Sequence, residues 1–212
     1  MIFKDRRQAG EELAAGLALY RSEEPLILAV PRGGVVVAEP VWESLGGDLD
    51  LTITRKIGAP QQSELAIGAV SNDGFVMLNE QLVARMFVSE QYIKQAVAAE
   101  QKEIERRLKT YRGNRPLPVV DDRLVILVDD GVATGYTLLA ALRSLQEKKP
   151  RKLVLAVPVG PPDTFNRLES EVDQLVFLHA PPNFAAVGQF YQYFDQVSDA
   201  AVSAILKKTG TK

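Results

Sequence analysis

The sequence predicts an α/β fold, a mainly parallel sheet flanked by helices, from three observations. Short continuous apolar runs, typical of strands buried on both faces, occur at residues 26–30, 124–128 and 153–157. Stretches with helical spacing separate these runs, as they do in parallel α/β sheets. The strongest run, 124–128, leads directly into two aspartates, a glycine-containing loop and a further helical stretch. Because such sheets bind ligands at the carboxyl ends of their strands, this loop is the first candidate for a site.

The elements of the first fifty residues follow from their apolar spacing. Residues 5–20 repeat apolar positions every three or four residues behind an aspartate suited to cap a helix. The run at 26–30 lies between two prolines and predicts a buried strand. Residues 35–45 return to helical spacing, although Pro40 should start, kink or stop that helix. Residues 49–53 predict the next strand.

The middle of the chain predicts a loop, a hairpin and a helical insertion. Residues 57–64 are polar, contain Gly and Pro and lack periodicity, which predicts a mobile loop. Strand-like segments at 66–70 and 75–78 flank Ser71-Asn72-Asp73-Gly74, a sequence suited to a hairpin turn. Residues 79–111 have helical spacing with one break and predict a helical insertion.

The second half of the chain alternates again between the two patterns. A helix follows the loop after the 124–128 strand and runs through Gln146. Further elements are predicted as strands at 153–157 and 175–178, as a helix at 163–169 and as a last helix that Ser198 caps and that runs to Lys207.

The composition excludes several kinds of function. The chain has 212 residues, 25 Lys and Arg against 27 Asp and Glu, no Cys and one His. Thiol chemistry, cysteine-based metal sites and multi-histidine metal sites are therefore excluded. The length favours a single domain over residues 1–212, and a net charge of −2 gives no general attraction to nucleic acid. Since no apolar run approaches the ~18 residues of a membrane span, we expect a cytoplasmic protein without a membrane partner.

The loop at 131–137 has the features of a phosphate-binding loop. It places glycines, free backbone N–H groups and two threonine hydroxyls at the start of a helix, whose dipole favours negative charge. It matches neither the G-x-x-x-x-G-K-[ST] loop nor the G-x-G-x-x-G fingerprint, which disfavours an NTPase or a dinucleotide enzyme. Asp129 and Asp130 come immediately before it. Because carboxylates repel phosphate, they imply sugar hydroxyls or Mg²⁺ in between, and the sequence predicts a sugar phosphate ligand.

A family resemblance follows from these residues. The thirteen residues 125–137, with four apolar residues, two acids and a loop ending Thr-Gly-Tyr-Thr, resemble the phosphoribosyl-pyrophosphate (PRPP) signature of type I phosphoribosyltransferases. Pro31-Arg32-Gly33-Gly34 resembles the family's pyrophosphate loop, and Arg55-Lys56 with 57–68 resembles its basic pair and flexible catalytic loop. Together with the segment 186–191, these motifs most resemble a bacterial group of predicted phosphoribosyltransferases known mainly by its fold.

The resemblance implies a fold, an activity and partners. The fold would be that of a type I phosphoribosyltransferase, with a β-hairpin flexible loop, the helical insertion at 79–111 and a small C-terminal hood at 179–197. The activity would be Mg²⁺-dependent transfer of the 5-phosphoribosyl group from PRPP to a nitrogen acceptor such as a nucleobase, with release of pyrophosphate. Mg²⁺ would be held mainly by PRPP, near Asp129 and Asp130 but without direct side-chain ligands. The family also implies a homodimer and a place in nucleotide metabolism.

The resemblance also assigns residues to roles. Asp129 and Asp130 would hold the ribose hydroxyls, with Arg55 and Lys56 adding positive charge at the leaving pyrophosphate. Purine-salvage members carry an Asp where this chain has Ala133, so Glu64 is the candidate general base instead. Backbone groups of Arg32, Gly33 and Gly34 would bind pyrophosphate. The loop for the 5-phosphate would consist of Gly131, Val132, Ala133, Thr134, Gly135, Tyr136 and Thr137.

Two other functions stay open at the level of sequence. A basic run would suit a PRPP-sensing regulator that binds nucleic acid, although the acidic composition disfavours that partner. A PRPP or nucleotide hydrolase would use Glu64 to activate water. The basic run comprises Arg106, Arg107, Lys109, Arg112 and Arg115. Five aromatic residues could either stack on an acceptor base or pack on the C-terminal helix, and these are Phe184, Phe190, Tyr191, Tyr193 and Phe194.

Overall fold

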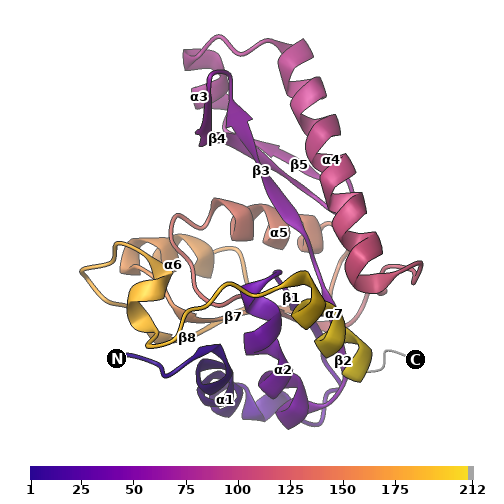
Figure 1. The fold of residues 1–212 in the computed structure, drawn as a ribbon, viewed down its shortest axis with the longest axis vertical. Coiled ribbons are helices and arrows are strands. Elements are labelled where there is room, and N and C mark those ends of the chain that lie inside the picture. The colour runs from indigo at the N-terminus through magenta and orange to yellow at the C-terminus, as the bar shows by residue number, and fades with distance from the viewer. Residues whose placement is uncertain (210–212) are drawn as a thin grey trace.

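A five-stranded sheet, in which all strands are parallel, forms the centre of the molecule (Figure 1). The computed structural model describes residues 1–209, and the strand order is β2-β1-β6-β7-β8. The predicted mainly parallel sheet is therefore confirmed. Its strands are β1 (Leu26–Ala29), β2 (Asp48–Leu51), β6 (Leu124–Val128), β7 (Lys152–Val159) and β8 (Gln174–His179).

Helices cover both faces of this sheet. On one face lie α1 (Arg6–Gly16), α2 (Gly33–Leu45) and α7 (Asp199–Lys208), and on the other lie α5 (Tyr136–Gln146) and α6 (Pro162–Glu169). Alternate side chains of each strand supply the two cores, because successive residues of a strand point to opposite faces. Ile27 of β1 belongs to the first core, whereas Leu26 and Leu28 belong to the second. This two-faced burial is why the strands read as continuous apolar runs.

The helix α2 passes through Pro40, so of the three predicted effects of this residue, a start, a kink or a stop, the start and the stop are wrong. Proline removes one intrahelical hydrogen bond, which costs stability in a helix interior. Here Pro40 is buried where α2 contacts α1. A Cβ added to Gly10 would lie 2.5 Å from Pro40 Cγ and 2.3 Å from the Val37 carbonyl oxygen. Burial of the ring in this close helix contact offsets the lost bond.

A second part of the molecule, here called the upper lobe, rises above α5 in Figure 1. Its antiparallel sheet has the order β3-β4-β5. The predicted hairpin is confirmed, with Gly68 opposite Leu78 and Val70 opposite Val76. The predicted helical insertion forms two helices. The elements of the lobe are β3 (Thr54–Ala59), β4 (Gln62–Ser71), β5 (Val76–Leu78), α3 (Glu80–Arg85) and α4 (Glu90–Arg112).

Residues 57–64 form paired strands rather than the irregular loop that the sequence predicts. Ile57 lies opposite Gly68 and Ala59 opposite Gln62, with a tight turn in which Gln61 has φ 63°. Residues 62–65 are exposed and, apart from Leu65, polar, so no apolar alternation marks this stretch as a strand. A register irregularity near Gly58 disturbs the pattern further.

Polar contacts connect the upper lobe to strand β2 and to helix α5. Arg112, at the end of α4, donates from Nε and Nη2 to the two carboxylate oxygens of Asp50 in β2, both at 2.7 Å. These side chains are only 4% and 3% exposed. On the other side, Asp73 in the β4–β5 turn accepts a 2.7 Å hydrogen bond from Ser144 of α5 and pairs with Lys148 at 2.8 Å. The lobe is thus tied both to β2 and to α5.

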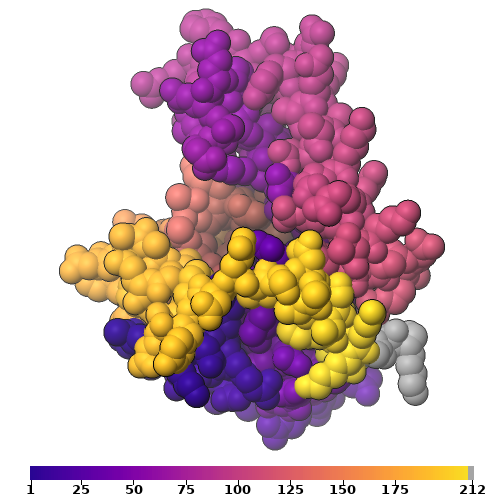
Figure 2. Space-filling model, in the orientation of Figure 1, coloured from indigo at the N-terminus to yellow at the C-terminus, as the bar shows by residue number. Residues whose placement is uncertain are grey.

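The N-terminal segment lies beside residues 190–192, close to the other end of the sequence. Phe3 N–H donates to the Phe190 carbonyl at 2.8 Å, and Gln192 N–H donates to the Phe3 carbonyl at 2.8 Å. Figure 2 shows the yellow C-terminal segment lying across the front of the body, below the upper lobe. Within residues 1–209, no helix is both long enough and apolar enough to cross a membrane.

Candidate functional site

Two of the predicted segments meet at the carboxyl edge of the central sheet. Strands β1 and β6 are neighbours, with Ala29 opposite Val128, so the loops that follow them are adjacent. The loop after β1 lies very close to the loop after β6, because a Cβ on Gly33 would lie 1.9 Å from Asp130 Oδ2. A Cβ on Gly34 would lie 2.8 Å from the Val128 carbonyl oxygen. No side chain fits at either position, which explains why two glycines follow β1.

Asp129 and Asp130 form an electrostatically strained pair at this edge. Asp130 N–H donates to Asp129 Oδ1 at 2.8 Å. Burial raises the pKa of Asp129 well above its usual range, and the charge of Asp130 raises it further. Burial also raises the pKa of Asp130, against the opposing effect of a hydrogen-bonded arginine, Arg6. A ligand that offers hydroxyl donors or a cation would stabilise both carboxylates in their ionised form.

Arg6 is a site residue that the sequence analysis missed. Its Nε donates to Asp130 Oδ2 at 2.7 Å, and its Nη1 donates to the Asp195 carbonyl at 2.8 Å. The guanidinium carbon lies 3.8 Å from the centroid of the Phe194 ring. Arg6 therefore connects the first turn of α1, the aspartate pair and the C-terminal segment. Its partners lie 124 or more residues away, so no local sequence pattern could have identified it.

Tyr191 is a second contact that the sequence did not reveal. Its hydroxyl donates to the Asp130 backbone carbonyl at 2.6 Å. Burial, together with the nearby charge of Asp130, raises the pKa of Tyr191. The hydroxyl thus stays protonated and available as a donor at neutral pH, and it fixes the backbone of the aspartate pair.

A cavity of about 370 Å³ opens beside the aspartate pair. Arg32 and Gly33, both predicted to bind pyrophosphate, line it together with Arg6 and residues 194–197. The peptide bond between Pro31 and Arg32 is cis. Arg32 Nη1 lies 3.8 Å from Asp199 Oδ1, which leaves most of its hydrogen-bonding capacity free within the described chain. Two arginines and the start of α2 thus line this cavity, together with the acidic residue Asp195.

The loop at 131–137 ends in an exposed helix N-terminus. Gly135 has the left-handed conformation, with φ 72°, and caps α5 without a side-chain hydrogen bond. The first intrahelical bond runs from Leu139 N–H to the Gly135 carbonyl at 2.8 Å. The N–H groups of the first three helical residues therefore have no intrahelical acceptor and are available to an anion. Val132 N–H is already bonded to Val159, at 2.9 Å, so it fixes the loop rather than serving a ligand.

The predicted basic pair and general base lie in the upper lobe. Arg55 pairs with Glu100 of α4, and Lys56 pairs with Glu64 across the β3–β4 hairpin at 2.7 Å. The hydrogen bond from Lys56 lowers the pKa of Glu64. Within residues 1–209, no hydrogen bond or ion pair links these four side chains to the aspartate pair. The structure thus brings together the loops at 31–34 and 129–137. Arg55 and Lys56 instead form ion pairs with glutamates of the upper lobe.

Three arginines of the basic run on α4 are paired with acidic side chains. Arg106 and Arg107 both donate to Glu103 at 2.7 Å, and these bonds lower the pKa of Glu103 to about 2. Arg112 forms a buried ion pair with Asp50 and is therefore not available at the surface. A continuous cationic surface suited to nucleic acid is therefore not formed by these three arginines.

The C-terminal aromatic residues pack mainly on the N-terminal segment. Phe190 and Tyr191 are buried with Phe3, and the ring centroids of Phe184 and Phe190 are 5.5 Å apart. For Phe184, Phe190 and Tyr191, the suggestion that they pack on the C-terminal helix is wrong, because α7 contributes to a different core. Tyr193 is 61% exposed at the rim of a hollow that adjoins Arg6.

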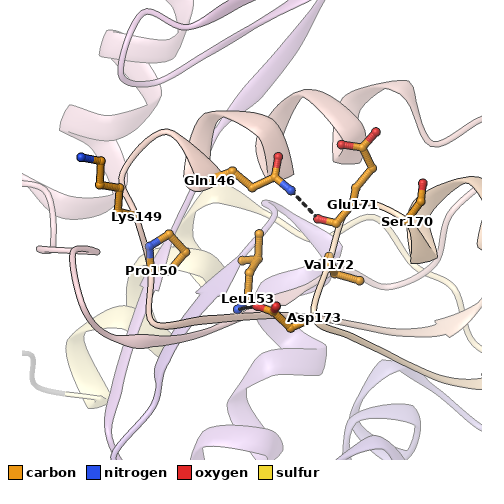
Figure 3. A pocket seen from close by; sticks show the side chains of 8 residues that line it. All are labelled: Gln146, Lys149, Pro150, Leu153, Ser170, Glu171, Val172 and Asp173. Atoms are coloured by element: carbon orange, nitrogen blue, oxygen red, sulfur yellow. Dashed lines mark hydrogen bonds between the residues drawn. The ribbon is translucent and has the colours of Figure 1, made fainter.

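A separate hollow of about 290 Å³ lies at the opposite edge of the sheet, where β7 begins and α5 ends (Figure 3). Gln146 donates to the Glu171 carbonyl at 2.8 Å, and Leu153 N–H donates to Asp173 Oδ2 at 2.7 Å. These polar groups are already satisfied by the protein. The hollow is therefore a gap between elements, remote from the aspartate pair.

Comparison with known proteins agrees with this geometry. The family model described as "Phosphoribosyl transferase domain" matches residues 3–191. Relatives from two strains of Mycobacterium tuberculosis, both named "Putative phosphoribosyl transferase", are 39% identical over 207 residues. The match covers 98% of this chain and 47% of each relative, so the chain spans about half the length of these curated relatives.

Solved structures give the same result for the fold. A crystal structure of a protein from Thermus thermophilus is 42% identical, with a TM-score of 0.85 and coverage of 98% of this chain and 99% of that one. The purine phosphoribosyltransferase of Pyrococcus horikoshii is 16% identical, with a TM-score of 0.50 over 91% of this chain and 92% of that one, and shows a similar fold only. Because the family model covers most of the chain, and the mycobacterial relatives align with nearly all of it, the chain belongs to the phosphoribosyl transferase domain family.

Proposed function

We propose that the chain transfers the 5-phosphoribosyl group of PRPP to a nitrogen acceptor, such as a nucleobase, and releases pyrophosphate. One observation carries the proposal. The exposed N-terminus of α5, the aspartate pair and the loop at 31–34 converge at one edge of the sheet, which suits a ligand with phosphate at both ends and hydroxyls between them. The sequences of these loops resemble the motifs of the phosphoribosyltransferase family, which supports the proposal.

The proposed roles follow from this convergence. The 5-phosphate would accept hydrogen bonds from the loop at 131–137, and the ribose hydroxyls would donate to Asp129 and Asp130. Pyrophosphate would lie against the backbone of Arg32, Gly33 and Gly34. In the reaction, the bond between ribose C1 and a pyrophosphate oxygen breaks, and a bond from C1 to the acceptor nitrogen forms. The chain's main contribution is then to hold the charges of the leaving group and the developing cation at C1.

Mg²⁺ fits this site as a ligand of PRPP rather than of the protein. Asp129 and Asp130 offer the oxygen donors that Mg²⁺ prefers. Across residues 1–209, however, no three acidic or histidine side chains come together as a metal site. Most ligands would thus come from pyrophosphate and water, with the aspartate pair close by. When bound, the ion would neutralise charge on the departing pyrophosphate.

The lobe residues would act after rearrangement of their ion pairs. Arg55 and Lys56 would exchange Glu100 and Glu64 for pyrophosphate oxygens, which offer more negative charge. Releasing Lys56 would return the pKa of Glu64 toward its ordinary value and make it a better proton acceptor. Glu64 is exposed at the β3–β4 hairpin, so it can approach an acceptor only if this hairpin moves. We further propose that the protein works as a cytoplasmic homodimer in nucleotide metabolism, on the basis of the family resemblance.

The test is pyrophosphate release from PRPP and Mg²⁺ across purines, pyrimidines, nicotinate-like acids and simple amines. The double variant Asp129→Asn/Asp130→Asn should lose about 100-fold or more of the activity while remaining folded. A matched control exists in Asp121→Asn/Asp122→Asn, because these exposed aspartates precede β6 at its other end. The control should retain full activity. Release without an acceptor would indicate a hydrolase, and PRPP binding without any release would indicate a regulator.

A further inference from the structure

Two side chains of α6 hold the phosphate loop from behind. Thr164 Oγ1 donates to the Ala133 carbonyl at 2.8 Å, and Arg167 Nη2 donates to the Thr134 carbonyl. Thr164 is buried. The guanidinium carbon of Arg167 lies 5.4 Å from the ring centroid of Tyr136, which is a second contact of this side chain. Successive carbonyls of one loop are thus tied to successive turns of one helix. None of these contacts involves the aspartate pair.

We infer that Thr164 and Arg167 are positioning residues that aim the N–H groups of Thr134 and Gly135 at the 5-phosphate. The inference rests on the proposed function. The carbonyl of one residue and the N–H of the next belong to the same peptide unit, and in a trans unit they point in opposite directions. Both peptide units here are trans. When α6 holds the carbonyls of Ala133 and Thr134, the following N–H groups must point away from α6, toward the side on which Ala133 and Thr134 are exposed.

The orientation matters because this loop has few other constraints. Gly135 has no Cβ and adopts φ 72°, so its own conformational preference is weak. Its neighbours on α6 are close, since an added Cβ would lie 2.8 Å from Thr164 Cγ2. Without the two hydrogen bonds from α6, the peptide units could rotate and present carbonyl oxygens, which repel phosphate. The α6 donors thus arrange the site before the ligand arrives.

The test uses Thr164→Val, which removes the hydroxyl without changing charge, and Thr164→Ser, which keeps the hydroxyl. Dissociation constants for ribose 5-phosphate and for Mg²⁺-pyrophosphate are measured on the full chain by titration calorimetry, with the melting temperature as a check on folding. Ribose 5-phosphate probes the loop at 131–137, whereas Mg²⁺-pyrophosphate probes the loop at 31–34. Thr110→Val is the matched control, because Thr110 also donates to a backbone carbonyl, at 2.9 Å, but on α4.

Thr164→Val should weaken ribose 5-phosphate binding roughly fivefold to tenfold, the effect of about one misdirected hydrogen bond, with Mg²⁺-pyrophosphate binding unchanged. Thr164→Ser should restore binding to within about twofold, and Arg167→Met should resemble Thr164→Val. Equal weakening of both ligands, unchanged ribose 5-phosphate binding in Thr164→Val, or no rescue by Ser would each overturn the inference. If the unaltered chain binds Mg²⁺-pyrophosphate but neither ribose 5-phosphate nor PRPP, the proposed function itself fails, and the inference fails with it.

Discussion

The carboxylate of Asp130 accepts a 2.7 Å hydrogen bond from Arg6, a residue 124 positions earlier in the chain. This contact joins the start of α1 to the end of β6 at the point where the candidate site opens. Since Arg6 also binds the Asp195 carbonyl and covers the Phe194 ring, one guanidinium links the site to the C-terminal segment. The charge on Asp130 therefore depends on a residue outside every recognised motif.

Replacing Arg6 should shift the pH dependence of activity. Arg6 opposes the effect of burial on Asp130, so Arg6→Met should raise the pKa of the aspartate pair further. The acidic limb of kcat/KM against pH should then move to higher pH. Arg7→Met, which removes an exposed partner of Glu43, serves as the control and should leave the profile unchanged. An equal loss of activity at all pH values would show that Arg6 acts only through folding.

Adding one methyl group at Gly33 should inactivate the site without unfolding the protein. In Gly33→Ala the Cβ would lie 1.9 Å from Asp130 Oδ2 and 2.9 Å from Arg6 Nε, so the carboxylate must move. A displacement of this size should cost about 100-fold in kcat/KM. Gly16→Ala at the end of α1 is the control, because its nearest neighbour would be Val176 Cγ1 at 3.1 Å. Full activity in Gly33→Ala would contradict a role for Asp130 in its observed position.

Breaking the buried pair between Arg112 and Asp50 should destabilise the whole chain. Arg112→Met leaves the Asp50 carboxylate buried without its cation, a change that costs about 3–5 kcal/mol of unfolding free energy. The double variant Asp50→Asn/Arg112→Met should lose less, since no bare charge remains. Urea denaturation at pH 7 measures both. Arg106→Met, an exposed arginine of the same helix, should change stability by no more than about 0.5 kcal/mol. An equally small effect of Arg112→Met would show that the pair does not anchor α4.

Asp73 should make folding stability depend on pH in the acidic range. Burial alone would raise the pKa of Asp73, but Lys148, Ser144 and Ser71 outweigh burial and lower it to about 2. A lowered pKa in the folded state adds stability that is present above pH ~4 and disappears as the pH falls toward 2. Asp73→Asn should therefore cost roughly 1 kcal/mol at pH 7, after allowance for solvent screening, and progressively less below pH 4. Urea denaturation of both proteins at pH 7, 4 and 2.5 tests this, and a difference independent of pH would contradict it.

The sequence predicted the central sheet well because the inner strands β1, β6 and β7 are buried on both faces. The run 124–128 forms β6 with the same bounds, and the other apolar runs agree within two residues at each end. The helix caps at Asp5 and Ser198 are also confirmed, because a cap acts on N–H groups only three residues away. Such features depend on neighbours in the chain and can be seen in it.

The hairpin at 57–64 shows the opposite case. There the end of β3 pairs with β4 through backbone hydrogen bonds. The exposed side chains at the start of β4 show no apolar alternation that could have revealed this pairing. Similarly, nothing local distinguishes Arg112, which is buried, from Arg106, which is exposed on the same helix. The basic residues are close together in the sequence. In the structure they have different partners, because Arg106 pairs with Glu103 on the surface and Arg112 pairs with the buried Asp50.

The sequence by itself determined the α/β class, the order of the strands along the chain and the acidic and glycine-containing loops, because burial periodicity, caps and turns are short-range properties. Only the tertiary structure decided which distant groups act on those loops. Arg6 and Tyr191 reach the aspartate pair, and Thr164 and Arg167 reach the phosphate loop. A hydrogen bond or ion pair depends on the position of both partners in space, and chain packing alone sets that position for residues so far apart in sequence.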